Sequence, residues 1–167
     1  MAVPYWNNAL TPYWDFAARG IMFGWTGAHG KEHAYRAILE GIAFEQRLMT
    51  DGAEKGLEKP VERLLAMGGG SNSSLWCQIM ADIMQRPLSI CQEVESTCLG
   101  AGMLAAAATG LHDGIQEAAE AMSAEGTTYQ PDEKRAARYD RIYNDVYKEL
   151  YPNLMPLFPA LDEALKI

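Results

Sequence analysis

A helical pattern of apolar positions dominates the chain between residue 31 and about residue 55. Small and apolar residues recur there at helical spacing: Ala34, Ala37, Ile38, Gly41, Phe44 and Leu48. Tyr35, Leu39 and Ile42 widen the same stripe. The pattern predicts one long helix that is buried on more than one side.

Short apolar runs alternate with further helical segments in the rest of the chain. Strands are predicted at residues 20–25, 61–67 and 86–91, which read "GIMFGW", "VERLLAM" and "RPLSIC". A helix follows the second strand, with Ser71 or Asn72 as its cap and an end near Met84. A helix of small residues is predicted from residues 95–97 to Gly110, and a short one over residues 115–123.

The two ends of the chain differ in character. Residues 3–19, "VPYWNNALTPYWDFAAR", contain aromatic and proline residues that predict an extended loop held by buried rings. The last helix is predicted to start at Pro131. Its apolar stripe consists of Tyr139, Ile142, Tyr143, Val146, Tyr147 and Leu150.

Helices therefore dominate, around two or three short strands in strand–helix–strand–helix order. A parallel sheet normally needs more strands than this to cover both of its faces. The aromatic, proline-broken stretch directly after Met1 is typical of the interior of a chain. We expect a helix-rich α/β fold that is an incomplete part of a larger protein.

The composition mainly argues against particular classes of partner and site. Hydrophobic residues at 49% and charged residues at 22% are ordinary for a soluble globular chain. The net charge of −8 argues against nucleic-acid and anionic-membrane partners. No leader pattern and no run of 18 apolar residues is visible. Cys77, Cys91 and Cys98 lack metal-ligand spacing, so we expect free thiols and a cytoplasmic location.

The segment "MGGGSNSSLWCQ", residues 67–78, is the first candidate for chemistry. Gly68, Gly69 and Gly70 lie where a predicted strand passes into a predicted helix. Backbone N–H groups at such a place can hold an anion, and the missing side chains let a nucleotide approach the backbone. The glycines match neither a Walker A loop nor the dinucleotide fingerprint. Ligand contact and a plain tight turn both remain open at this point.

The other candidates are less complete. His29 and His33 are four residues apart, but no third ligand is placed beside them, so a capping or packing role is favoured and no metal site is expected. No Gly-x-Ser-x-Gly motif is present, and no cysteine has a neighbouring base. Asp82 fits a polar position on the helix after the glycines. We assign no catalytic residue.

Taken together, these segments resemble the C-terminal domain of the FGGY family of carbohydrate kinases. The resemblance runs from "TPYWDFAARG" at residues 11–20 to "CLGAGMLAAAATG" at residues 98–110. Between them, "FGWTG" followed by "HAYRAILEGIAF" is similar to the family's Gly-Leu-Thr and Arg-Ala-x-Leu-Glu signature, with Trp25 in place of the usual leucine. Residues 68–88 resemble the family's adenosine-binding motif, and Glu95 with "CLGAG" resembles its Glu-x-x-x-Leu-Gly-Ala segment.

The resemblance implies a fold, a ligand and an activity. The family fold consists of two actin-like, ribonuclease H-like domains, with sugar in the first and the nucleotide held largely by the second. Residues 1–167 would then be the nucleotide-binding part of an ATP-dependent kinase acting on a sugar or polyol, with a pentulose such as xylulose as the expected substrate and Mg²⁺ as the accompanying ion. Gly68, Gly69 and Gly70 would let the backbone approach adenosine. Ser73 matches the family's adenine-contacting residue, and neighbouring Asn72 could substitute for it.

The same resemblance implies that the sugar-binding domain, the catalytic aspartate and the phosphate loops lie before Met1. The chain alone is therefore expected to be inactive, and to associate as a homo-oligomer or with the part that it lacks. The alternative is a non-catalytic, helix-rich interaction module derived from the same fold. A metal-dependent hydrolase built on His29 and His33 is the third hypothesis.

Overall fold

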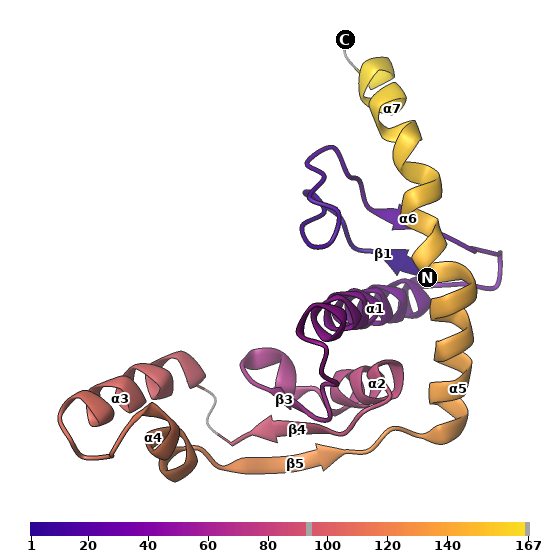
Figure 1. Cartoon of the computed structure of the whole chain (residues 1–167). Coiled ribbons are helices and arrows are strands. Elements are labelled where there is room, and N and C mark those ends of the chain that lie inside the picture. Colours follow the sequence, from indigo (N-terminus) through magenta and orange to yellow (C-terminus); the bar gives the residue numbers. More distant parts are fainter. Residues whose placement is uncertain (93–94, 166–167) are drawn as a thin grey trace. The chain divides into compact units, whose positions relative to one another are not determined.

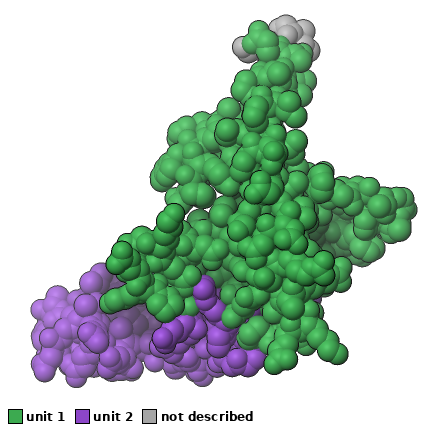
Figure 2. Space-filling view, turned by 45° about the vertical axis from the view of Figure 1, so that its right-hand side comes forward, with its two compact units in different colours: residues 1–61, 82–85, 131–167 green, residues 62–81, 86–130 purple. Residues whose placement is uncertain are grey.

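The computed structural model describes residues 1–92 and 95–165 and confirms a helix-rich α/β fold (Figure 1). The chain divides into two compact units, which Figure 2 colours separately. Unit 1 consists of Met1–Val61, Asp82–Gln85 and the chain from Pro131 onward. Unit 2 consists of Glu62–Ala81 and Arg86–Gln130.

Unit 1 is built on helix α1, Lys31–Leu57, which confirms the long helix expected from the apolar pattern. Strand β1, Ala2–Val3, pairs antiparallel with β2, Ile21–Met22. Strand β1 also packs against α1, where a Cβ on Gly41 would lie 2.3 Å from the Ala2 carbonyl oxygen. Only glycine allows the helix backbone to approach the strand this closely.

The C-terminal helices of unit 1 present tyrosines to α1. Helix α5, Glu133–Ile142, continues through a π-helical segment, Tyr143–Tyr147, into α6, Lys148–Leu154, and a 3₁₀ turn then leads to α7, Phe158–Leu165. In a regular α-helix, residues four apart drift around the axis by about 40° per step. The wider π turn offsets this drift, and Tyr139, Tyr143 and Tyr147 all pack on Phe44, with ring centroids 4.7 to 6.1 Å away.

Two expectations for unit 1 are wrong in detail. Pro131 does not start the last helix, because Asp132 is its N-cap and accepts a hydrogen bond from the Arg135 backbone nitrogen at 2.9 Å. The N-terminal loop is only partly held by buried rings: Tyr5 is buried, whereas Trp14 and Phe16 are 64% and 72% exposed.

Unit 2 contains a sheet with strand order β3-β4-β5. Strand β3, Leu64–Ala66, runs parallel to β4, Leu88–Cys91, and β5, Glu125–Tyr129, runs antiparallel to β4, beside it in Figure 1. The sequence analysis did not predict β1 or β5, because β1 is very short and β5 has no apolar run. Cys77, Ala81 and Leu88 form the buried centre of this unit.

The remaining helices of unit 2 match their predicted positions. Helix α3, Ser96–Ala108, ends before Gly110, which has a φ of +75°, and α4, Ile115–Met122, packs against α3. Cys77 and Cys91 are buried free thiols, and Cys98 is an exposed one. Among the described residues, no helix is long and apolar enough to cross a membrane.

Candidate functional site: the glycine turn between β3 and α2

The predicted glycine segment belongs to unit 2 and connects β3 to helix α2, Ser74–Met84. Residues Gly69–Asn72 form a short 3₁₀ helix that the sequence analysis did not anticipate. The cap of α2 is therefore neither Ser71 nor Asn72. Ser73 caps the helix instead: its Oγ accepts a hydrogen bond from the Trp76 backbone nitrogen at 3.3 Å.

Two of the glycines are required by the fold itself. Gly68 has a φ of +83° and a ψ of −177°, a conformation that is essentially restricted to glycine. Gly70 lies against the indole of Trp76, and a Cβ at position 70 would lie 2.1 Å from its Cζ3 atom. The local fold accounts for both residues without a ligand.

Gly69 differs from its two neighbours. It is exposed, it does not have a positive φ, and a Cβ built on it would meet no atom within 4 Å. Neither backbone strain nor packing in the described chain requires glycine at this position. The residue leaves the outer surface of the turn open for close approach by another molecule.

The turn is held in shape by its own hydrogen bonds. The backbone nitrogen and the Oγ of Ser71 both donate to the Gly68 carbonyl oxygen, at 3.1 and 2.7 Å. The Cys77 thiol donates to the Ser71 carbonyl oxygen at 3.4 Å, and burial raises the pKa of that thiol. The outer surface of the turn is therefore preformed.

Asn72 and Ser73 supply the polar side chains at this surface, and both are exposed. Within the described part of the chain, the Asn72 amide has no hydrogen-bond partner and can both donate and accept. The Ser73 hydroxyl accepts the Trp76 N–H, but its own proton is still available for donation. The structure thus brings all five predicted residues, Gly68, Gly69, Gly70, Asn72 and Ser73, into one turn.

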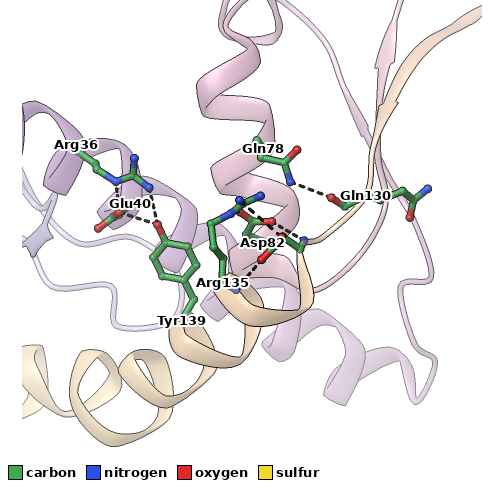
Figure 3. Close-up of polar contacts among 8 residues, drawn as sticks. Arg36, Glu40, Gln78, Asp82, Gln130, Arg135 and Tyr139 are labelled. Atoms are coloured by element: carbon green, nitrogen blue, oxygen red, sulfur yellow. Dashed lines mark hydrogen bonds and ion pairs between the residues drawn. The ribbon is translucent and has the colours of Figure 1, made fainter.

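Asp82, a possible acid or base by residue type, has a structural role in unit 1 (Figure 3). It is 1% exposed, and its carboxylate accepts hydrogen bonds from the Asp132 backbone nitrogen at 2.8 Å and from Arg135 Nε at 2.5 Å. This pairing fixes the start of α5.

His29 and His33 act as hydrogen-bond acceptors for backbone groups, in line with the capping role that the sequence favoured. The Nδ1 atom of His29 accepts from the Thr26 nitrogen at 2.9 Å, and that of His33 accepts from the Gly30 nitrogen at 3.1 Å. The described residues contain no cluster of three or more histidine, cysteine or acidic side chains placed to hold a metal ion.

Solved carbohydrate kinases share the helix-rich α/β fold of this chain, which is that of part of an actin-like ATPase domain. The model of the FGGY family of carbohydrate kinases, C-terminal domain, matches residues 1–109. The chain belongs to this family.

Individual relatives extend the similarity to nearly the whole chain. A gluconokinase from Bacillus licheniformis is 33% identical over 165 residues, which is 98% of this chain and 29% of that protein. A xylulose kinase from Bacillus subtilis (strain 168) is 32% identical over 143 residues, 84% of this chain and 28% of that protein. The crystal structure of ligand-bound xylulose kinase from Lactobacillus acidophilus has a TM-score of 0.86 at 30% identity, over 96% of this chain and 32% of that one. The chain thus spans less than a third of the length of these relatives.

Sequence reasoning missed the part that Trp76 plays in the turn. The residue lies six positions after Gly70 on the following helix, and its indole returns to fill the space beside that glycine. A large ring in the first turn after a glycine run was the available signal, but the sequence does not show toward which side the ring points.

Proposed function

We propose that the chain is the nucleotide-binding C-terminal part of an ATP-dependent carbohydrate kinase, and that Gly69 contacts the adenosine moiety of ATP. One observation carries the proposal: Gly69 is a glycine that the described fold does not require. The family match over residues 1–109 supports it, together with the resemblance of residues 68–88 to the family's adenosine-binding motif. Under this proposal residues 1–167 are one incomplete domain of a longer enzyme.

The residues of the turn fit an adenosine group. The missing side chain at Gly69 admits a flat ring close to the backbone, and the internal bonds of the turn avoid an ordering cost on binding. Asn72 and Ser73 offer exposed donors and acceptors for the edge of the adenine base. Ser73 is the primary candidate for this contact, and Asn72 is the second.

Magnesium would accompany the nucleotide in this proposal. Mg²⁺ is commonly held by one or two carboxylates together with substrate phosphate oxygens, so it does not need a cage within this chain. Phosphoryl transfer depends mainly on positioning and charge stabilisation, and a carboxylate accepts the proton of the substrate hydroxyl. We place that carboxylate and the sugar site outside residues 1–167, and we expect this chain alone to have no kinase activity.

For the acceptor, we propose a pentulose such as xylulose. The xylulose kinases among the relatives and the solved structures support this choice. Gluconate is the competing acceptor, since a gluconokinase covers 98% of the chain. Comparing kcat/KM for D-xylulose and gluconate, in the longest protein that the reading frame encodes, decides between them.

The variant Gly69→Val tests the nucleotide site. A Cβ at position 69 would meet no atom within 4 Å, so we expect the melting temperature of this variant to stay close to that of the parent. In the longest protein that the reading frame encodes, we expect ATP affinity to fall at least about tenfold, roughly 1.4 kcal/mol, while sugar binding stays near normal. Gly56→Val on α1, another open glycine without a positive φ, is the matched control.

Two other outcomes of these binding measurements would each contradict a different part of the proposal. A lower melting temperature with unchanged ATP affinity would identify a merely tight turn and refute the adenosine contact. Absence of nucleotide binding in the parent protein would refute the kinase proposal and favour the interaction module.

A further inference from the structure

Unit 1 contains a cavity of about 410 Å³, a volume in the range of small-molecule sites. It is lined by the first half of α1, by α5 and by the loop that precedes α1. Its polar lining side chains are those of His29, His33, Arg36, Glu40, Arg135, Arg138 and Tyr139. Arg36, Glu40 and Arg135 appear in Figure 3.

The carboxylate in this lining is already paired. Arg36 donates from Nε to Glu40 Oε1 at 2.7 Å and from Nη2 to the Tyr139 hydroxyl at 3.0 Å, and that hydroxyl donates to the same Glu40 oxygen at 2.7 Å. Among the described lining residues, Glu40 is the only acidic one. Because the Glu40 carboxylate already accepts these hydrogen bonds, few free hydrogen-bond acceptors remain in the cavity.

Hydrogen bonds to the His29 and His33 side chains determine which nitrogen of each imidazole carries the proton. A backbone N–H can only donate, so Nδ1 of His29 and Nδ1 of His33, which each accept one, are unprotonated. The proton of each neutral ring is therefore on Nε2. The His29 ring also contacts the rings of His33 and Trp25, with centroids 5.2 and 5.3 Å away, and these contacts hold its orientation.

Arg138 contributes a charge without a partner. Arg36 is offset by Glu40, and Arg135 by Asp82 and Asp132. Within the described part of the chain, Arg138 forms no ion pair or hydrogen bond, although the chain as a whole has a net charge of −8. The cavity therefore combines an unmatched guanidinium with two imidazole donors, and its available polar groups are almost all hydrogen-bond donors.

We propose that this cavity binds the phosphate group of a small molecule. A phosphate offers several acceptor oxygens and a negative charge, which match Arg138 and the Nε2–H groups of His29 and His33. Trp25 and Phe44 in the same lining leave apolar wall for an uncharged body attached to the phosphate. This inference is independent of the nucleotide site, since it uses residues of unit 1 alone.

Phosphate titration of the 167-residue chain, at constant ionic strength, tests the proposal. The probes are inorganic phosphate and glucose 6-phosphate, with chloride balancing the salt. We expect saturable binding with a Kd of about 1 mM or tighter. Tighter binding of glucose 6-phosphate indicates that the apolar wall holds the organic body, and equal binding indicates recognition of the phosphate alone; both results support the site.

A matched pair of variants on α5 locates the binding. Arg138→Gln removes a lining guanidinium that has no ion-pair or hydrogen-bond partner among the described residues, and Arg141→Gln makes the same change at an exposed position outside this cavity. We expect Arg138→Gln to weaken phosphate binding at least about fivefold, through loss of a charge-assisted hydrogen bond, and Arg141→Gln to leave it within about twofold. Both variants should retain the parent's melting temperature.

The histidines provide a second readout. The chain contains 3 histidines, of which His29 and His33 line the cavity and His112 does not. The NMR signals of the two lining imidazoles should shift with phosphate, while those of His112 stay constant. The proposal is overturned if neither probe binds saturably at about 20 mM, if the two arginine variants weaken binding equally, or if His112 responds as strongly as the other two.

Discussion

Gly70 and the indole of Trp76 compete for the same space. A Cβ on Gly70 would lie 2.1 Å from Cζ3 and 2.8 Å from Cε3 of the ring, far inside the roughly 3.5–4 Å at which carbon atoms attract. Trp76 is half-buried in the first turn of α2, so the ring cannot move away without loss of packing. This pair explains why a glycine is needed at position 70 but not at position 69.

The first prediction is that Gly70→Ala is rescued by Trp76→Leu. The single alanine should destabilise the protein by about 1–3 kcal/mol through overpacking. With a leucine at position 76 the added methyl group has room, so the two changes should be coupled by at least about 0.5 kcal/mol in a double-mutant cycle measured by urea unfolding. Gly69→Ala, which meets no neighbouring atom, is the control and should have little effect. If the unfolding free-energy changes of the two substitutions are strictly additive, the Trp76 ring is not the reason that position 70 requires glycine.

The second prediction separates the two roles of Ser73. Ser73→Ala should lower stability by about 1 kcal/mol through loss of the helix cap, whereas Ser73→Gly should cost only a few tenths. If the hydroxyl also contacts adenine, both variants should weaken ATP binding by about 0.5–1.5 kcal/mol. Exposed Ser74→Ala is the control. ATP affinity that is unchanged in both variants would assign the base contact to Asn72.

The third prediction concerns the buried carboxylate of Asp82. Asp82→Asn keeps an acceptor for the Asp132 nitrogen and leaves a half-exposed Arg135 free to reach solvent, so we expect a loss of about 1–2 kcal/mol. Arg135→Gln should lower the urea midpoint further, because it removes the ion pair that Arg135 forms with a buried carboxylate. Lys134→Gln, an exposed neighbour, serves as control. The reverse order of the two midpoints would contradict this account.

The fourth prediction is a pH dependence centred on Glu45. Burial raises the pKa of its carboxyl above the ordinary 4.5, although the Tyr147 and Tyr5 hydroxyls donate to it at 2.6 and 2.8 Å and act in the opposite direction. Between the ordinary and the raised pKa the folded state binds more protons than the unfolded state. The contribution of this group to stability is therefore greatest at low pH and falls as the pH rises through the raised value.

Replacement of Glu45 should flatten this dependence. In Glu45→Gln, the thermal midpoint should fall less than in the parent as the pH rises from about 4.5 toward neutrality, because the amide does not titrate. Exposed Glu62→Gln, with an unchanged pH profile, is the control. Parallel profiles for the parent and Glu45→Gln would show that this carboxyl ionises freely in the folded protein.

The sequence by itself determined the features that depend on local chemistry. The spacing of apolar residues set the long helix α1 to within two residues, because a single amphipathic stripe specifies a helical period without reference to the rest of the chain. The glycine run between a strand and a helix located the candidate site for the same reason. The order of short motifs was enough to recognise the family.

Only the tertiary structure decided the rest. Strand β5 has a polar sequence and exists because β4 offers it a paired edge. The cap of α2 moved to Ser73 because a 3₁₀ turn could form ahead of it. Gly69 and Gly70 look identical in the sequence and differ only in whether the Trp76 ring lies beside them. The cavity between α1 and α5 is lined by side chains about a hundred positions apart in the sequence, such as Arg36 and Tyr139. Contacts between such distant positions depend on packing, so no local sequence pattern predicts them.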